Sequence, residues 1–244
     1  MTSSISPDAQ RDLAPTGKLR VGLNYGNFLL VLRDQPDGTP QGIAPDLARE
    51  LAKRLGMAIE FVKFDAAGKL ADGVKSGAWD VAFLGNEPQR AAEIAFSPAY
   101  LEIPVTYLVP AGSPIQALAD VDRKGVRVAV ADKSAYHLFM MRELKNAELV
   151  SADGIDGSYK LFIDSKLDAL AGLMPRLLTD QQKNPGSRVL EGRLTSVQQS
   201  IGTPRSRETA ARYLKEFAQD VKKSGLVKEL IERHKVPGVS VAPL

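Results

Sequence analysis

The residues that could carry out chemistry are few in this chain, and their types exclude several kinds of site. The sequence contains no cysteine, which excludes disulfides, thiolate nucleophiles and cysteine-based metal sites. Its two histidines, His137 and His234, stand far apart and lack neighbouring carboxylates at a metal-ligand spacing. We therefore expect no metal and no cofactor, and we expect both histidines to pack against helices or lie at the surface.

Arg90 is the residue best suited to bind an anion. A guanidinium presents a planar fork of donors that matches a carboxylate in a bidentate way. Taken alone, this arginine is more simply interpreted as a cap or ion pair near a short helix that starts at Pro88. Gly85, which precedes it, either lets backbone approach a ligand closely or forms an ordinary tight turn. The two interpretations of Gly85 stay open, and the family resemblance described below favours the binding role of Arg90.

The composition is typical of a globular protein and argues against nucleic-acid binding. The 244 residues are 44% hydrophobic and 25% charged, which is enough to bury a core in one large or two smaller domains. Lys and Arg together number 32 and barely exceed the 29 Asp and Glu residues. The basic residues do not cluster with aromatic residues between them, so we expect no nucleic-acid partner.

The N-terminal residues 1–17 lack the basic and apolar regions of a signal peptide. The apolar stretch at 28–32 is far shorter than the roughly 20 residues that cross a bilayer. We therefore expect a chain that does not span the membrane. Its location is the periplasm if a leader was removed, with the cytoplasm as the alternative because no signal peptide is present.

Short β-type runs alternate with amphipathic helical patterns, which is typical of α/β proteins with largely parallel sheets. The first series predicts strands at 19–24, 59–64 and 80–84 and helices at 45–56 and 68–76. A β-branched run at 100–109 and a turn-rich stretch at 110–114 follow. The second series predicts strands at 126–131, 147–150 and 168–173, helices at 134–144 and around 159–163, and later a strand through Ile201 with helices at 208–223 and 226–234.

Three short motifs are spread along the chain. Residues 80–100 give a strand with an aspartate, a glycine turn, an arginine, then Phe-Ser and Pro-Ala-Tyr. Residues 42–47 read Gly-Ile-Ala-Pro-Asp-Leu, and residues 165–169 read Ser-Lys-Leu-Asp-Ala. No single motif is decisive, but their order from about residue 19 to 235 resembles the family 3 solute-binding proteins of ABC amino-acid importers.

This resemblance implies a two-lobed type II periplasmic-binding fold of the α/β class. Each lobe would be a mainly parallel sheet flanked by helices, and the lobes would close over a ligand. Lobe 1 is expected at 17–109 plus 197–244 and lobe 2 at 110–196, with hinge crossings near 109–111 and 195–198. Ligands in such open sheets lie outside the carboxyl ends of the strands.

The resemblance also implies which residues bind the ligand. Arg90 is expected to anchor an anion, with Gly85 and Asn86 beside it. Ser134 begins a helix and would offer its hydroxyl and free N–H groups to the same anion. Lys133 either adds positive charge there or points to solvent, which we favour. The other expected lining residues are Asn24, Tyr25, Asn27, Phe28, which is equally compatible with the core, and Gln199.

Leu173 departs from the family pattern. Amino-acid binders of the family carry a carboxylate at this position, which holds the ammonium of the ligand. An aliphatic side chain cannot pair with a buried ammonium, and an unpaired buried charge is costly. Glu87 and Asp132 are alternative partners. We therefore expect a small carboxylate-bearing ligand, either an amino acid or a related organic acid.

The leading functional hypothesis is a monomeric solute-binding protein that presents this ligand to the permease of an ABC importer. The alternatives are a dehydratase-like enzyme on the same scaffold, with Glu87 as acid or base, and a ligand sensor. Binding is favoured because no pair of titratable groups in the expected cleft is arranged to divide acid and base roles.

Overall fold

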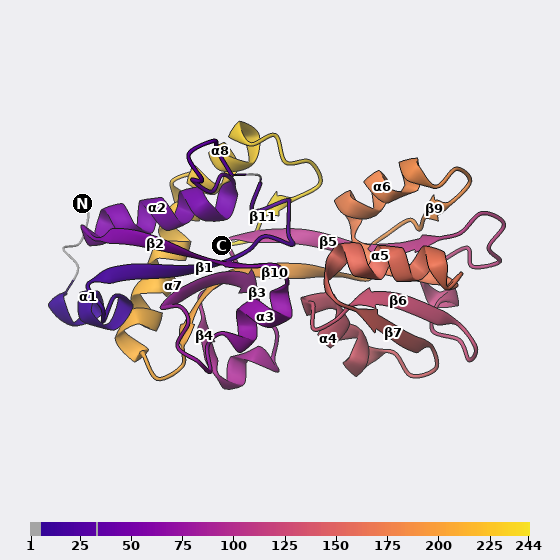
Figure 1. Cartoon of the computed structure of the whole chain (residues 1–244), viewed down its shortest axis with the longest axis horizontal. Helices are drawn as coiled ribbons and strands as arrows, with labels where there is room; N and C mark the ends of the chain where they lie inside the picture. The colour runs from indigo at the N-terminus through magenta and orange to yellow at the C-terminus, as the bar shows by residue number, and fades with distance from the viewer. Residues whose placement is uncertain (1–5, 33) are drawn as a thin grey trace. The chain divides into compact units, whose positions relative to one another are not determined.

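The computed structural model describes residues 6–32 and 34–244, and its contacts divide it into two compact units (Figure 1). Unit 1 holds the described residues up to Leu101 together with Gln198–Val236 and Ser240–Leu244. Unit 2 holds Glu102–Val197 and Pro237–Val239. Both units combine strands with helices, so the α/β class expected from the sequence is confirmed.

Unit 1 is built on parallel strands joined by helices. Its central strand β1 (Lys18–Asn24) pairs in parallel with both β2 (Ala58–Phe64) and β3 (Val81–Gly85). Strand β10 (Thr195–Pro204) runs antiparallel to β3 and to the short β4 (Ile94–Phe96). Because parallel strands end at the same side of a sheet, the loops after β1 and β3 are neighbours. We call residues 24–28, residues 85–90 and Gln199 the carboxyl edge of unit 1.

The helices of unit 1 bury apolar faces against this sheet and against each other. Helix α2 (Ile43–Leu55) contacts β1 and β2, and α1 (Pro7–Leu13) packs against α7 (Glu208–Lys223) (Figure 1). Helix α2 ends at Gly56, whose φ of 64° is a left-handed conformation that glycine adopts without steric cost. The helical segments of unit 1 are α1 (Pro7–Leu13), α2 (Ile43–Leu55), α3 (Ala67–Asp72), η1 (Arg90–Ala92), α7 (Glu208–Lys223) and α8 (Leu226–Arg233).

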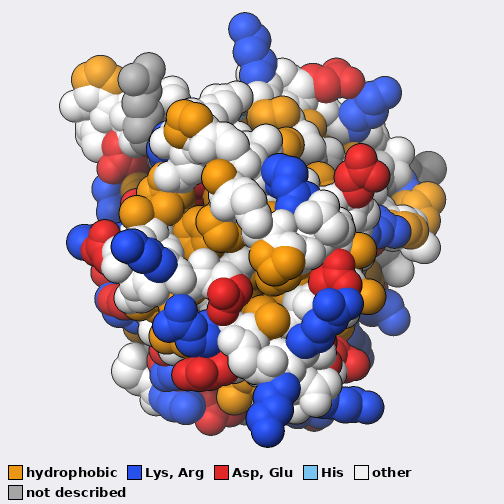
Figure 2. All heavy atoms as spheres, turned by 90° about the vertical axis from the view of Figure 1, so that its right-hand side faces the viewer, with side chains coloured by type: hydrophobic (Ala, Val, Ile, Leu, Met, Phe, Trp, Pro, Cys, Tyr) orange, Lys and Arg blue, Asp and Glu red, His pale blue; other side chains and the backbone are white. Residues whose placement is uncertain are grey.

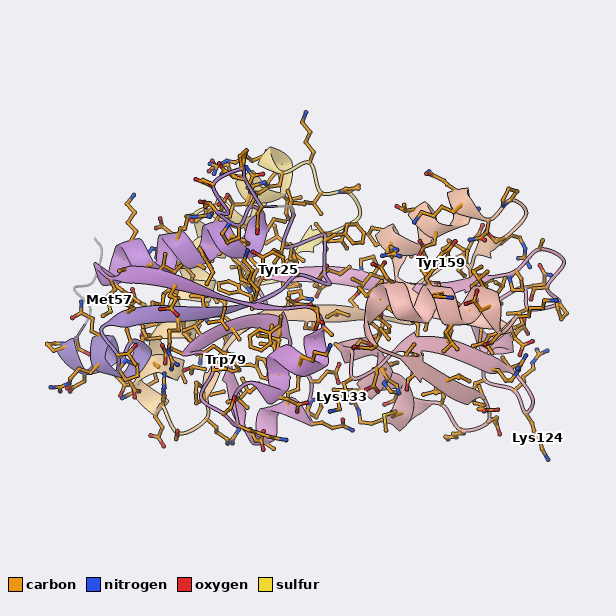
Figure 3. All side chains as sticks on the ribbon, viewed as in Figure 1. Tyr25, Met57, Trp79, Lys124, Lys133 and Tyr159 are labelled. Atoms are coloured by element: carbon orange, nitrogen blue, oxygen red, sulfur yellow. The ribbon has the colours of Figure 1, made fainter. Side chains whose placement is uncertain are left out.

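Helix α3 is shorter than the helix expected at 68–76. It ends at Asp72, and turns continue to Gly77. The reason is Trp79, whose buried indole N–H donates to the carbonyl oxygen of Leu70 at 2.8 Å and competes with the helical hydrogen bond to that oxygen. The indole also lies where a side chain at Gly73 would be, since a Cβ there would meet its nitrogen at 2.9 Å. Trp79 is labelled in Figure 3.

A buried carboxylate connects distant parts of unit 1 at the amino ends of β1 and β3, opposite the carboxyl edge. Asp80 is fully buried and forms ion pairs with Arg20 and Arg207, each at 2.8 Å. Burial alone would raise the pKa of Asp80, but hydrogen bonds from Arg20 and Arg207 outweigh it and hold the pKa below its ordinary value. Asp80 therefore joins the start of β3 to β1 and to the residue that precedes α7.

Unit 2 repeats the plan. Strand β6 (Arg127–Ala131) pairs in parallel with β7 (Glu148–Ala152) and β8 (Ala169–Leu173). Strand β5 (Leu101–Val109) runs antiparallel to β8 and to β9 (Arg188–Val189). The remaining elements are η2 (Leu118–Asp120), α4 (Ala135–Glu143), α5 (Gly154–Asp164) and α6 (Met174–Lys183) in unit 2 and β11 (Ser240–Val241) in unit 1. Much of the core of unit 2 is formed by Phe162, Leu167, Leu170 and Leu177.

Strand β5 bears on where the chain changes unit. Its residues from Val105 onward pair with β8 and β9. Almost the whole strand therefore belongs to unit 2. The sequence instead suggests a boundary at the turn-rich stretch that follows, because turns are visible in a sequence and pairing partners are not. The expected lobes, 17–109 plus 197–244 and 110–196, stay a prediction.

The face drawn in Figure 2 carries charges of both signs. On the face drawn in Figure 2, Lys and Arg side chains are interspersed with Asp and Glu and form no continuous basic stripe. None of the helices formed by residues 6–32 and 34–244 is both long enough and apolar enough to cross a membrane.

Candidate functional site

The end of β3 places Arg90 at the carboxyl edge of unit 1. Gly85 is the last residue of the strand, and the backbone N–H of Asn86 donates to Gln198 at 2.8 Å. The chain then turns around Glu87, whose carbonyl oxygen accepts from the N–H of Arg90 at 2.9 Å. This turn directs the arginine back toward its own strand, and its Nη1 donates to the carbonyl oxygen of Gly85 at 2.6 Å.

Arg90 is a buried cation. It is 7% exposed, and burial lowers its pKa to about 10, while the nearby carboxylates of Glu87 and Asp72 act in the opposite direction. The guanidinium therefore remains protonated at neutral pH. A charged group with little water around it interacts strongly with an opposite charge, because the local dielectric constant is low. A buried, protonated guanidinium is chemically suited to pair with a carboxylate, and the binding role of Arg90 stays a prediction.

The loop after β1 is held in place by its own polar groups. The side-chain oxygen of Asn24 accepts from the N–H of Gly26 at 3.0 Å, and the carbonyl oxygen of Asn27 accepts from Leu30 and Val31 at 3.0 Å each. Gly26 is required here, since a Cβ would meet the carbonyl oxygen of Asp65 at 2.3 Å. The loop is therefore pressed against the residue that follows β2.

Tyr25 contributes an aromatic side chain to this loop (Figure 3). Its hydroxyl donates to Asp34 at 2.8 Å, and the Lys63 ammonium lies 5.0 Å from the ring centroid. Burial and the Asp34 carboxylate raise the pKa of Tyr25. The ring is thus fixed by two charged neighbours, and it remains half-buried.

Two further expected residues lie at the same edge. Gln199 is 5% exposed and pairs with Gly85 across the β10–β3 ladder. Phe28 is 37% exposed, so it does not belong to the core, which was one of its two expected roles. The described structure therefore brings together, within unit 1, the predicted residues Asn24, Tyr25, Asn27, Phe28, Gly85, Asn86, Arg90 and Gln199.

Unit 2 places the other predicted residues at the corresponding ends of its strands. Ser134 caps α4, is 6% exposed, and accepts from the N–H of His137 at 3.1 Å. Lys133 is exposed and has a left-handed φ of 49°. Leu173 is the last residue of β8 and is 4% exposed. Because β6 and β8 are parallel neighbours, the turn at 132–134, which follows β6, and Leu173, which ends β8, lie at the ends of adjacent strands. Their role in binding stays a prediction.

A salt-bridge cluster next to Leu173 was not anticipated from the sequence. Arg176, in the first turn of α6, bonds the fully buried Asp180 at 2.8 Å and Asp156 of α5 at 2.7 Å. Its guanidinium lies 5.9 Å from the ring centroid of Tyr159, and that hydroxyl accepts from Asn184 at 2.6 Å. These contacts join α5 to α6. The (i, i+4) spacing of Arg176 and Asp180 was a usable signal, but no helix was expected there.

Tyr136 is a weak lining candidate from the sequence, where a role in helix packing is the simpler interpretation. It lies in the first turn of α4 and is 3% exposed. Burial raises its pKa to about 12, so the phenol is neutral at physiological pH.

Across residues 6–32 and 34–244, no group of three or more His, Asp and Glu side chains is placed to hold a metal ion.

Solved structures share this fold over nearly the whole chain. The solute receptor for L-cysteine of Neisseria gonorrhoeae matches with a TM-score of 0.78 and 22% identity, covering 96% of this chain and 95% of that chain. The P235GK mutant of ArgBP from T. maritima matches with a TM-score of 0.75 and 22% identity, covering 92% and 98%. The ancestral amino acid-binding protein AncCDT-1 matches with a TM-score of 0.73 and 21% identity, covering 92% and 98%. At these identities the likeness concerns the fold.

The model of one protein family matches the chain itself. It is described as bacterial extracellular solute-binding proteins, family 3, and it covers residues 19–236. That span contains every predicted binding residue of both units. The resemblance drawn from the sequence motifs and the type II periplasmic-binding fold are thereby confirmed. The chain belongs to the bacterial extracellular solute-binding proteins of family 3.

Proposed function

We propose that the protein binds a small carboxylate-bearing solute, an amino acid or a related organic acid, and presents it to the permease of an ABC importer from the periplasm. The observation that carries this proposal is Arg90, a buried guanidinium at the carboxyl edge of unit 1 that is held in place by the backbone of Gly85. The planar fork of a guanidinium matches the two oxygens of a carboxylate.

Residues of unit 2 support an anionic ligand. Ser134 presents a hydroxyl at the N-terminus of α4, where free backbone N–H groups favour negative charge, and Lys133 precedes it. Leu173 is aliphatic and buried, so it offers nothing to an ammonium group. These residues therefore favour recognition of a carboxylate, and an α-ammonium would need another partner, such as Glu87 or Asp132.

Related structures support a ligand of this size. Proteins with the same fold include a solute receptor for L-cysteine, an ABC transporter binding component complexed with lysine and an amino-acid ABC transporter substrate-binding protein bound to L-arginine. We propose binding without catalysis, because the matching family model describes solute-binding proteins. Turnover of a bound compound would replace this proposal with an enzyme on the same scaffold.

A ligand screen with matched variants tests the proposal. A compound that binds the native state raises the melting temperature by mass action, by an amount equivalent to about 2.7 kcal/mol at a hundredfold excess over Kd. Amino acids, keto acids and dicarboxylates would be compared on the wild type, on Arg90→Ala and on Arg123→Ala. Arg123 is an exposed arginine of unit 2 and serves as the control.

We expect at least one carboxylate to stabilise the wild type and Arg123→Ala but not Arg90→Ala. The proposal is wrong if no carboxylate stabilises the wild type, or if Arg90→Ala responds as strongly as the control. Isothermal titration of the best compound would then give the affinity and stoichiometry.

A further inference from the structure

His137 turns its imidazole back onto the turn that precedes α4. Its Nδ1 lies 3.0 Å from the backbone nitrogen of Lys133, which donates to it. In the other direction, the backbone N–H of His137 donates to the hydroxyl oxygen of Ser134 at 3.1 Å. The residue is 8% exposed. The two hydrogen bonds close the turn and the start of the helix onto each other.

The first of these bonds depends on the protonation state of the ring. A ring nitrogen accepts a hydrogen bond only when it carries no proton, so neutral His137 must hold its proton on Nε2. Protonation at Nδ1 would place a donor against the Lys133 N–H. The carboxylate of Asp132, whose Oδ1 lies 3.4 Å from Nδ1, is the partner that the charged ring would then take.

The hydrogen bond to His137 matters because of the backbone conformation of Lys133. Its φ of 49° lies in the left-handed region, which non-glycine residues adopt only when their surroundings hold them there. The bond from its N–H to His137 supplies such a constraint. Losing it would free the turn to relax toward ordinary backbone geometry, and Ser134, the next residue, would move with it.

We propose that His137 is a positioning residue for Ser134 and makes anion binding at this turn sensitive to acid, strong while the ring is neutral and weak once it is protonated. This inference rests on the proposed function, since it assumes that Ser134 contributes to binding a carboxylate.

The charges around the ring set the direction of the effect. Burial lowers the pKa of His137, and Asp132 on the turn opposes this. The charged groups of α4 itself, Arg142 and Glu143, lie at its far end, where Arg142 donates to Leu138 at 2.9 Å. The ring is therefore neutral at neutral pH and becomes charged only in acid. An imidazolium would also attract an anion, but Asp132 at 3.4 Å offsets that charge, so the change in geometry should dominate.

Two substitutions separate the hydrogen bond from the titration. In His137→Asn the side-chain oxygen can accept from the Lys133 N–H but cannot titrate in this range. In His137→Phe the ring is kept and the acceptor is lost. The control is His234→Asn, which alters the other histidine, located in unit 1. The dissociation constant of the carboxylate found in the screen would be measured by calorimetry from pH 4.5 to 8.

We expect the wild type and His234→Asn to lose affinity by up to about tenfold per pH unit below the pKa of His137, as release of one proton requires. His137→Asn should keep the neutral-pH affinity with a flatter profile. His137→Phe should bind about tenfold more weakly at every pH, since the acceptor that holds the Lys133 N–H is missing. A wild-type pH profile in His137→Asn, or affinity that rises in acid, would overturn the proposal.

A second measurement does not need a ligand. Nitrogen-15 NMR of the free protein should show neutral His137 with its proton on Nε2, and the Lys133 amide should shift as the ring titrates. If no carboxylate binds but these signals appear, the proposed function fails and the acid-sensitive turn stands. If the Lys133 amide does not follow the ring, the positioning role is wrong whatever binds.

Discussion

The guanidinium of Arg90 donates to the carbonyl oxygen of Gly85, five positions earlier in the chain, at 2.6 Å. The arginine is thereby fixed by the strand that ends beside it. Fixing the side chain in advance reduces the entropy lost when a ligand is captured. A lysine would keep the charge but not the fork of donors that can hold the backbone and a carboxylate together.

Arg90→Lys is therefore expected to weaken binding of the carboxylate ligand by about ten- to a hundredfold while preserving its selectivity for anions. Calorimetric titration of the wild type and the variant would measure this, with circular dichroism to verify the fold. Equal affinities would show that charge alone, and not the geometry of the guanidinium, is recognised.

Leu173→Asp should change which ligands are preferred. A carboxylate at this buried position offers a partner to an ammonium, so the ratio of affinities for an amino acid and its keto-acid analogue should move toward the amino acid by about tenfold. Because the substitution also buries a charge, the ratio and not the absolute affinity is the measured quantity. Leu173→Asn, which has similar size and no charge, is the control; the same shift there would contradict the argument.

Asp80→Asn should destabilise the protein by about 3 kcal/mol, because it leaves Arg20 and Arg207 without their shared buried carboxylate. Urea denaturation followed by circular dichroism would measure the free energy of unfolding. Asp8→Asn is the control, since Asp8 pairs with Arg11 at an exposed position and should change stability little. Similar losses in both variants would contradict the role given to Asp80.

The same carboxylate predicts a pH dependence. Its pKa is lower in the folded protein than in the unfolded chain, so its contribution is complete above the ordinary aspartate range and is lost as pH falls through the folded value. The stability difference between wild type and Asp80→Asn should therefore be constant above about pH 5 and shrink in stronger acid. Urea denaturation from pH 2.5 to 7 tests this, and a difference that grows in acid would refute it.

Gly22→Ala should destabilise unit 1 by about 1–3 kcal/mol. A Cβ at this position in β1 would lie 2.5 Å from Cδ1 of Leu70 and 3.1 Å from the Trp79 ring. Gly157→Ala is the matched change in α5, where a Cβ meets nothing closer than 3.6 Å and should be tolerated or stabilising. Adding Leu70→Val to Gly22→Ala should recover part of the loss.

Local patterns in the sequence were sufficient for most of the fold. Alternating β-type runs and apolar helical faces predicted β1, α2, β2, β3, β6, α4, β8, α7 and α8 in order. Helix α6 was not expected, because it begins directly after Leu173 at Met174-Pro175 and no turn separates it from its strand. The short β4, β9 and β11 depend on pairing partners far away in the sequence, which local periodicity does not contain.

In the candidate site, too, local sequence patterns predict some features, whereas others depend on the three-dimensional structure. Arg90 and Ser134 could be proposed as site residues because their motifs are local, and the structure puts the first in a buried position and the second at a helix cap. The bond between His137 and Lys133 was not foreseen, although only four positions separate them, because it requires the left-handed backbone at Lys133. Likewise, nothing local connects Asp80 to Arg20 and Arg207.

The Asp80 ion pairs and the predicted binding loops of unit 1 lie at opposite ends of the same strands. Arg20 and Asp80 stabilise the start of β1 and β3, whereas residues 24–28 and 85–90 follow their ends. Loop exchange should therefore alter ligand preference without a large loss of folding free energy. This separation makes the chain a suitable scaffold for engineering sensors, in which new recognition loops are grafted onto an unchanged framework.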